Sequence, residues 1–492
     1  MTTTEQPTIE ERSPKSHPQQ DNGSASWWRL LVLRLHFYVG VFVGPFLLVA
    51  ATSGALYALS PQLEPLLYER ELYVAATDDP LPLSAQIEAA RGVEPGSDLL
   101  GVRPAPQPGD TTRVLFDNGD LGESESHAVF VDPGTGDVRG ELTTYGTSGA
   151  LPVRMWIDQL HRSLLLGDTG RLYSELAASW LWVMALAGVV LWVSHLRRRR
   201  RARGASHAKV APAALRGRAR TRSLHGGLGI WLAVAFLGLS VTGLTWSTYA
   251  GANVTELRTQ LAWMAPELAT GSAPAGLHQG RGDAGSGASA STAPGSASDP
   301  TTYDPTTYDQ VLTTARNAGI DADKVEILAA AEAGQAWTVT EVDRGWPTQV
   351  DAVSIDPQSL AVVDEVRFAE YPFMAKMARW GIDAHMGALF GLPNQILLAG
   401  VGTGLVLMIV WGYRMWWQRR PRHGSALRFG KPFPRGALRR LPLPVLVLGG
   451  IGVLLVGWFL PLLGLSLLAF LAVDSLLALR ARHRHRQEAA AG

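Results

Sequence analysis

Long stretches without a charged side chain alternate along the chain with acidic and arginine-rich segments, and this alternation limits the possible folds most strongly. About 20 mostly apolar residues form a helix that crosses the roughly 30 Å hydrocarbon core of a bilayer. Six segments fit this description: His36–Ser60, Ser174–Ser194, Leu224–Thr248, Leu392–Met415, Leu443–Leu460 and Leu462–Leu479. The sequence therefore predicts a polytopic α-helical membrane protein whose last two segments form a hairpin.

The distribution of charge predicts the orientation. The segments Arg197–Arg222 and Arg414–Arg440 are rich in arginine and contain no acidic residue, which is typical of cytoplasmic loops. Both termini are then cytoplasmic, and the two large acidic loops are extracytoplasmic. A cleaved signal peptide is the alternative for the first apolar segment, but its length and the long polar stretch before it favour an uncleaved anchor.

These signals divide the chain into consecutive parts. They are a disordered cytoplasmic tail (1–26), a helix (27–60), an extracytoplasmic unit (61–173), a helix (174–196), a basic loop (197–222), a helix (223–248), a second extracytoplasmic unit (249–391) with a flexible Gly/Ala/Ser-rich linker at 271–300, a helix (392–417), a basic loop (418–441), a helical hairpin (442–480) and a cytoplasmic tail (481–492).

The composition excludes several kinds of chemistry. The 492 residues contain no cysteine, so the chain has no disulfide, no thiol nucleophile, no cysteine-ligated iron–sulfur cluster and no covalently attached c-type haem. A formal net charge of +1 argues against a nucleic-acid partner. Any metal chemistry must use histidine, methionine, tyrosine or carboxylates.

A tandem repeat organises the membrane helices. The first helix of each copy carries a histidine and, eighteen residues later, a glycine that follows a hydroxyl residue: His36 with Ser53-Gly54, and His225 with Thr242-Gly243. Before the second helix of each copy, IDQLHRSLLLG and IDAHMGALFG place a glycine six residues after His161 and His385. Such internal similarity indicates a repeated structural unit.

The extracytoplasmic units repeat as well. Each has a helix-like stretch, Ser84–Arg91 or Tyr308–Ala318, followed by strand-like runs. Each then has two alternating apolar runs around a turn, at Asp132-Pro133 or Asp356-Pro357, which is typical of a hairpin. A small α+β fold is predicted for each unit.

The four repeated histidines are the candidate site. His36 and His225 lie at the cytoplasmic starts of their helices, and His161 and His385 lie just before the outer starts of theirs. Ionisable residues at the membrane boundary suggest function, and imidazole is an axial ligand of haem iron. We expect two b-type haems in a four-helix bundle, one between each pair. Zinc or copper would usually want a further ligand, and His195 remains an alternative inner ligand.

Other residues are predicted to support these sites. Gly40, Gly44 and Gly229 would let a flat macrocycle approach the backbone, although close helix packing explains them equally well. Arg162 and Arg171 would pair with haem propionates.

Two aspartates and a further histidine complete the candidates. Asp158 and Asp383, just before the outer histidines, would accept an imidazole N–H or cap a helix. His127 is interpreted as a surface histidine.

Four motifs carry a resemblance to a known family: LHFYVGVFVG, LHRSLLLGDTGRL, LHGGLGIWLAVAFLGLSVTG and DAHMGALFG. Together with the two PepSY-like units, they make residues 31–420 similar to the PepSY-associated transmembrane-helix family. That family includes iron-regulated inner-membrane proteins and haem-containing ferric-siderophore reductases.

The resemblance implies an oxidoreductase of the bacterial cytoplasmic membrane with two b-type haems, which moves electrons outward to a ferric siderophore or another ferric chelate. The matching ligands are His36, His225, His161 and His385. In this chain Phe37-Tyr38 follows the first of these where an Arg-aromatic pair is expected, which leaves the propionate contacts of the inner haem undetermined. No glycine-rich nucleotide-binding turn is present, so the electron donor is a quinol or a separate cytoplasmic reductase.

Two other functions are compatible with parts of the sequence. PepSY-like domains also occur in peptidase inhibition, so the chain could be a membrane-anchored binding or regulatory protein without redox activity. A transporter would need acidic residues within the helices, and these are nearly missing from the first four. The acidic outer units suggest a cationic chelate, but acidity also fits a solvated surface.

Overall fold

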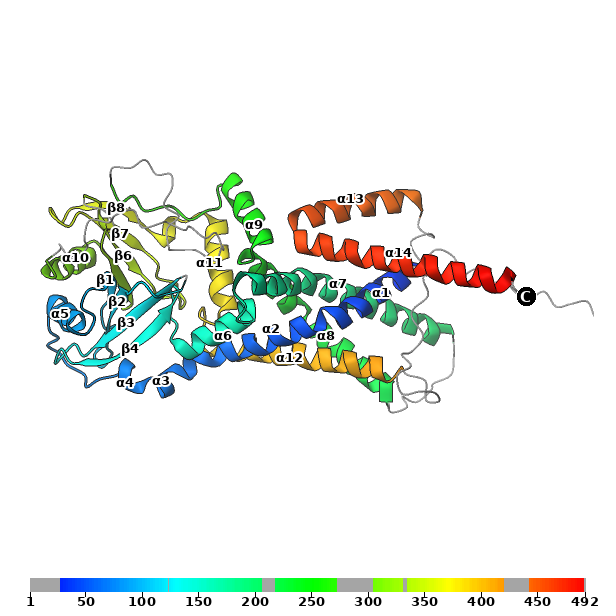
Figure 1. Ribbon diagram of the computed structural model, residues 1–492, viewed down its shortest axis with the longest axis horizontal. Helices are drawn as coiled ribbons and strands as arrows, with labels where there is room; N and C mark the ends of the chain where they lie inside the picture. Colours follow the sequence, from blue (N-terminus) through cyan, green and yellow to red (C-terminus); the bar gives the residue numbers. More distant parts are fainter. Residues whose placement is uncertain are drawn as a thin grey trace, which may run out of the picture.

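The computed structural model describes residues 27–122, 124–205, 217–271, 304–330, 334–419 and 442–490. A bundle of long helices carries a β-sheet with short helices at one end (Figure 1). We call this end the sheet domain. The predicted tail at 1–26, the predicted linker beyond residue 271 and the loop residues 420–441 lie outside the described ranges.

Among the described residues, four helices are long and apolar enough to cross a membrane: α2 (Gly44–Leu59, with the span continuing to Gln62), α7 (Gly167–Ala205), α8 (Gly217–Thr245) and α12 (Leu392–Trp417). They overlap the first four predicted spans, and the chain is a multi-pass membrane protein. Helix α7 is longer than predicted because the arginines after residue 196 continue the helix, as good helix formers do. The hairpin helices α13 (Leu443–Phe459) and α14 (Pro461–Ala490) have shorter apolar stretches.

The first predicted span is two helices, because α1 (Trp27–Phe42) ends just before α2 begins. Pro45 has no N–H to donate to the carbonyl of Val41, the residue four positions earlier. The hydroxyl of Tyr413 donates to that carbonyl instead, at 2.8 Å. A Cβ atom at Gly44 would lie 3.0 Å from the same hydroxyl, so this glycine makes room for Tyr413.

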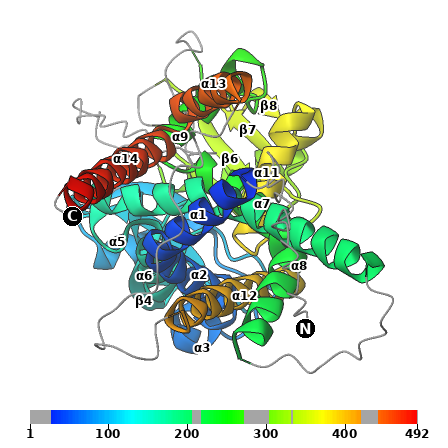
Figure 2. The same ribbon diagram turned by 90° about the vertical axis from the view of Figure 1, so that its right-hand side faces the viewer.

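The C-terminal hairpin packs against the bundle through α14, on the side away from α12 (Figure 2). Leu460 and Leu463 are buried in the apolar core of the bundle. The indole of Trp180 donates to the hydroxyl of Ser466 at 2.9 Å, and Arg34 forms an ion pair with Asp474. No residue of α13 is buried, which suits a helix that faces lipid.

The two repeated units share one sheet. Its eight antiparallel strands run in the order β4-β3-β2-β1-β5-β6-β7-β8, with bounds β1 (Asp98–Arg103), β2 (Thr112–Asp117), β3 (Glu125–Val131), β4 (Val138–Tyr145), β5 (Val325–Leu328), β6 (Trp337–Glu341), β7 (Ala352–Ile355) and β8 (Val362–Val366). The predicted hairpin turns join β3 to β4 and β7 to β8. The sequence predicts an α+β unit in each copy, but not that β1 and β5 pair and join the two copies.

Short helices cover the sheet. Helices α5 (Leu83–Val93) and α10 (Thr306–Asn317), both predicted, share one apolar core with strands of both copies, while α3 (Glu64–Leu67) and α4 (Glu69–Leu72) precede the sheet. Helices α6 (Pro152–Ser163), α9 (Tyr249–Gln260) and α11 (Phe373–His385) lie between sheet and bundle (Figure 1). The buried carboxylate of Glu175 accepts the N–H groups of Tyr249 and Ala250 and so caps α9.

Candidate functional site

The repeated histidines form two pairs. His36 of α1 and His225 of α8 lie at the end of the bundle far from the sheet domain, and we call them the distal pair. Their ring centroids are 6.2 Å apart, with ring planes at 83°. His161 of α6 and His385 of α11 line one cavity next to the sheet domain, and we call them the sheet-side pair.

The two distal imidazoles face equivalent backbone groups. Nδ1 of His225 lies 3.0 Å from the carbonyl oxygen of Met408. The backbone of Met184 faces His36 in the same way, although no hydrogen bond of ordinary geometry satisfies Nδ1 of His36. Met184 and Met408 each follow the sheet-side histidine of their own repeat by 23 residues. The internal repeat therefore extends to the groups that orient the distal rings.

The glycines near the distal pair contact methionines. A Cβ atom at Gly40 would lie 3.3 Å from the methyl carbon of Met184, and one at Gly229 would lie 2.9 Å from that of Met408. Both glycines thus let the end of a flexible side chain pack against the helix backbone. Because that side chain can move, the same bare backbone surface would also accept a flat ring.

The sheet-side histidines are held by the hydroxyl residues of the repeat. Nδ1 of His161 lies 3.1 Å from Oγ of Ser53, and Nδ1 of His385 lies 2.6 Å from Oγ1 of Thr242. A Cβ atom at Gly54 would lie 3.0 Å from Cε1 of His161. The Ser/Thr-Gly step therefore supplies both a polar contact and space for the ring.

These contacts favour one tautomer of each sheet-side imidazole. The Ser53 hydroxyl lies 2.7 Å from the carbonyl oxygen of Val49, and the Thr242 hydroxyl lies 2.9 Å from that of Gly238. When each hydroxyl donates to its carbonyl, its oxygen accepts the N–H of Nδ1, which leaves the lone pair on Nε2. Burial lowers the pKa of His385, which lies outside the membrane-spanning helices, to about 3. A neutral ring with a free Nε2 is the form that ligates metals.

The cavity of the sheet-side pair has a volume of about 750 Å³, within the range of small-molecule and cofactor sites. Its apolar part comes mainly from the bundle helices and includes small residues of α2 and α12 such as Gly54 and Gly402. Its polar part contains four arginines, which come from a strand, a loop and two helices: Arg103, Arg162, Arg344 and Arg379. The edge of the Trp246 indole packs on the ring of His385, with centroids 5.4 Å apart. The cavity thus combines two imidazoles, an apolar wall and an excess of cations.

The sequence that includes α2, α7, α8, α12 and the sheet domain matches a family. A sequence model of the PepSY-associated TM region matches residues 33–419. The chain belongs to this family. A search among curated proteins finds no match.

In this PepSY-associated chain, two predicted partners differ in position. Arg162 lines the sheet-side cavity and bonds to the hydroxyl of Tyr145. Arg171 is buried, donates to the carbonyl of Trp246 at 3.3 Å and is not among the lining residues. His195 lies near the guanidinium groups of Arg222 and Arg29. The repeat motifs alone do not predict the contacts of these three side chains.

Asp383 has a different partner from the one predicted. Its side chain is fully buried, and its Oδ2 accepts from Nε of Arg379 at 2.8 Å. Arg344 lies 3.7 Å from its other oxygen. Thr242 contacts Nδ1 of His385, so the carboxylate of Asp383 pairs with the arginines rather than with the imidazole. The sequence had marked Ser53 and Thr242 only as landmarks of the repeat.

We expect Thr242→Val to weaken cofactor retention at the sheet-side pair. Valine has nearly the shape of threonine but cannot accept the Nδ1–H of His385. Loss of such an orienting partner typically lowers metal affinity about 10- to 100-fold. The measurement is haem retained per chain during titration with apomyoglobin. Thr245→Val, whose hydroxyl bonds only to the backbone of its own helix, is the control and should retain haem like the wild type.

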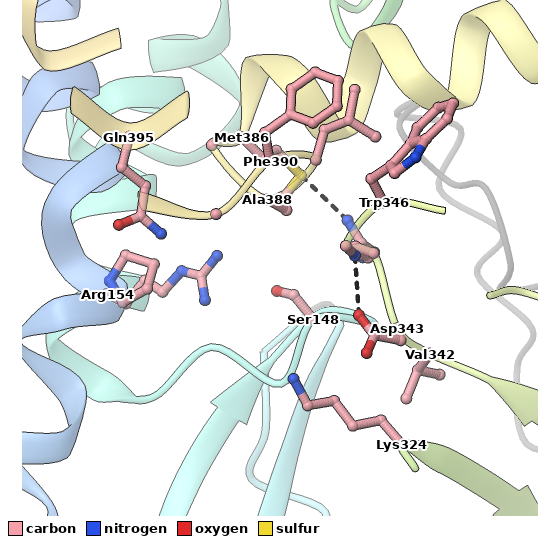
Figure 3. A pocket seen from close by; sticks show the side chains of 16 residues that line it. Ser148, Arg154, Lys324, Val342, Asp343, Trp346, Met386, Ala388, Phe390 and Gln395 are labelled. Atoms are coloured by element: carbon pink, nitrogen blue, oxygen red, sulfur yellow. Dashed lines mark hydrogen bonds between the residues drawn. The ribbon is translucent and has the colours of Figure 1, made fainter. Parts of the chain in front are cut away.

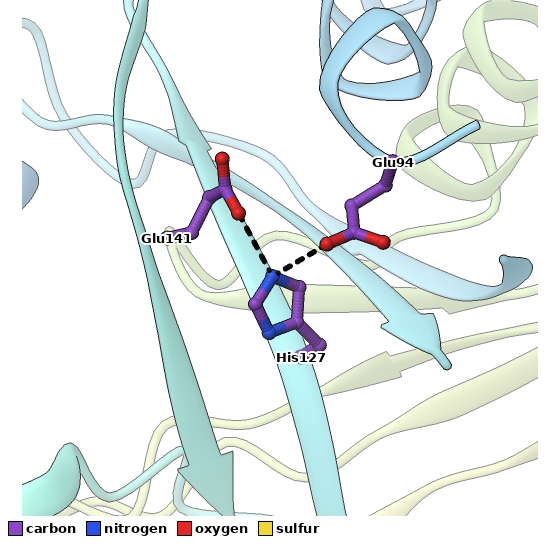
Figure 4. Close-up of side chains that lie close together, drawn as sticks. All are labelled: Glu94, His127 and Glu141. Atoms are coloured by element: carbon purple, nitrogen blue, oxygen red, sulfur yellow. Dashed lines mark hydrogen bonds and ion pairs between the residues drawn. The ribbon is translucent and has the colours of Figure 1, made fainter. Parts of the chain in front are cut away.

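His127 of the family's sheet domain lies between two carboxylates rather than free at the surface. Its Nε2 is 2.9 Å from Glu94 and 3.3 Å from Glu141 (Figure 4). The three groups could hold a metal ion by composition and distance. Both carboxylates are directed at the same imidazole nitrogen, so the cluster is explained as a polar link between the end of α5 and strands β3 and β4.

Proposed function

We propose that the protein is a transmembrane electron carrier with two b-type haems, which reduces a ferric chelate on the sheet side of the membrane. The observation that carries this proposal is the repeated pair of oriented imidazoles at two depths. Ser53 and Thr242, which contact the sheet-side histidines, each lie seventeen residues after a distal histidine. At 1.5 Å per helical residue this separates the pairs by about 25 Å, most of a bilayer core.

The residues of both pairs would suit haem iron, because each pair offers two imidazoles and imidazole is a haem ligand. The two distal rings lie close together, with centroids 6.2 Å apart, and both sheet-side histidines line one cavity. In the sheet-side cavity, Arg162, Arg344 and Arg379 offer the forked donors that suit propionate carboxylates.

Each group has a defined task in this proposal. Bound haem would supply one-electron chemistry, while Met408, Ser53 and Thr242 hold the imidazole planes and keep Nε2 unprotonated. A quinol or a cytoplasmic reductase gives up one electron at the distal end. A chelated ferric ion at the sheet side gains that electron and becomes ferrous, which oxygen-rich chelators hold less strongly. The sheet domain is extracytoplasmic in this arrangement, and both termini are cytoplasmic.

An optical spectrum of the detergent-purified protein, oxidised and then reduced with dithionite, tests the proposal. We expect two haems per chain with low-spin b-type bands, and reoxidation of the reduced protein by a ferric chelate. Protein made with ample haem that contains none would contradict the proposal. It would then favour the alternative, a membrane-anchored binding or regulatory protein in which the PepSY-like units engage a peptide or protease.

A further inference from the structure

A second cavity, of about 540 Å³, lies beside the sheet-side pair where the sheet domain meets the start of α12 (Figure 3). We call it the cationic cavity. The residues that matter for the argument are Arg154, Lys324, Arg344, Trp346, Met386 and Phe390. They come from α6, from the two ends of the β5–β6 hairpin region, and from the turn between α11 and α12.

The cationic cavity adjoins the cavity of the histidines. Arg344 and Met386 line both, and the guanidinium of Arg344 contacts the sulfur of Met386 at 3.2 Å. Met386 directly follows His385 in the chain. The two cavities therefore share two lining side chains, one of them next in sequence to His385.

The charge of the cationic cavity is positive. Three cationic side chains line it, against the single carboxylate of Asp343. Arg154 and Lys324 reach into it from different sides in Figure 3. Two carboxylates lie behind these cations: Glu64 is 3.7 Å from Arg154, and Asp383, which also pairs with Arg379, is 3.7 Å from Arg344. Nε of Arg154 is nevertheless buried without a hydrogen-bond partner. Guanidinium groups bind carboxylates through two parallel hydrogen bonds, so the cavity suits an anion with several carboxylates.

An apolar wall adds to this charge. The rings of Trp346 and Phe390 have centroids 6.0 Å apart, and the two side chains are 59% and 57% exposed. Exposed aromatic side chains next to cationic groups can pack on the uncharged body of a ligand while the cations bind its acidic groups. The same rings also fit an aromatic belt at the membrane surface, which would place the opening of the cavity near the lipid headgroups.

We propose that the cationic cavity binds the substrate of the reductase and that this substrate is an anionic, carboxylate-bearing ferric chelate. The inference rests on the proposed function and specifies the substrate class. It reverses the expectation from composition, because Asp343 is the one acidic residue among the lining residues and the other charged residues that line this cavity are cationic.

Gallium(III) chelates test binding without redox chemistry, because Ga³⁺ has the charge of Fe³⁺ but accepts no electron from the protein. The experiment uses the full chain in phosphatidylcholine nanodiscs and compares anionic gallium citrate with cationic gallium desferrioxamine B by calorimetry. We expect the citrate complex to bind at least about tenfold more tightly. Lys324→Gln should weaken its binding about three- to tenfold, as for one partly screened charge. Lys376→Gln, on α11 and outside the lining residues, should not change it.

Three outcomes would overturn the inference: equal affinity for the two complexes, no effect of Lys324→Gln, or loss of citrate binding when phosphatidylglycerol is added to the nanodiscs. The last would assign the cavity to a lipid phosphate. Charge-selective gallium binding in a protein that contains no haem and reduces no ferric citrate would contradict the proposed reductase instead, and would leave an anion site without that role.

Discussion

Replacing His225 with alanine is expected to reduce the haem content of the purified protein from two per chain to one. His225 is half of the distal pair, and its Nδ1 is fixed by the carbonyl of Met408 at 3.0 Å. In the proposed carrier, alanine would leave the distal haem with His36 as the one remaining ligand of the distal pair. The sheet-side pair lies about 25 Å away along the helices and keeps both its ligands.

The measurement is haem per chain by the pyridine haemochrome method, together with the reduced spectrum. Electron flow across the membrane should fall below detection in proteoliposomes with a donor on the distal side only, while dithionite should still reduce the remaining haem. His36→Ala should reproduce the result. His385→Ala should instead remove the sheet-side haem and leave the distal one.

His195→Ala is the matched control for this experiment. His195 lies on α7 at the distal end, near Arg29 and Arg222, and the structure does not include it in the distal pair. The His195→Ala variant should retain both haems and full electron flow. Loss of both haems in His225→Ala, in a variant that still elutes as a single species, would contradict the two-site arrangement, and so would retention of both.

Periodicity and charge predict the coarse fold of this protein because both act locally. The apolar length of α2, α7, α8 and α12 can be read from the sequence, since a bilayer demands about 20 apolar residues. The order of helices and strands in the sheet domain can also be predicted, because alternating apolar residues and turn residues are local signals. The sequence also contains a signal for the break between α1 and α2, because Pro45 cannot donate a backbone hydrogen bond within a helix.

Contacts between segments that lie far apart in the sequence are harder to predict. The hydrogen bond between Ser53 and His161 joins residues 108 positions apart, so the repeat could mark both residues but could not pair them. The junction of β1 with β5 is of the same kind. The β1–β5 pairing forms where the two copies meet, and neither copy taken alone contains a sequence feature that predicts it.

The polar residues of the sheet-side cavity show this limit most clearly. Arg344 and Arg379 were not among the predicted site residues, because both lie outside the residues that the repeat motifs mark. Their common partner, Asp383, was identified through its position beside His385, but the predicted contact was with the imidazole. Only the packing of α11 against the loop after β6 determines which of these charges meet.

Because this packing buries the carboxylate of Asp383 between two arginines, Asp383→Ala should strongly destabilise the sheet-side region. The Asp383 side chain is 0% exposed, and those of Arg379 and Arg344 are 11% and 17% exposed. Removing the carboxylate leaves two poorly hydrated guanidinium groups without their anion, a change that costs about 3–5 kcal/mol for buried pairs. The thermal midpoint of the apoprotein should fall by roughly 10 °C for a domain of this size, measured by scanning fluorimetry in detergent.

Two further variants separate the charge from the size of the side chain. Asp383→Asn keeps the volume and one acceptor oxygen, so it should fall between wild type and alanine. Asp79→Ala, on an exposed stretch of the sheet domain, should change the midpoint little, because surface substitutions rarely exceed 0.5 kcal/mol or so. If Asp383→Ala melted like Asp79→Ala, the carboxylate would not hold the two arginines, and their guanidinium groups would need another reason to line the cavity of the sheet-side histidines.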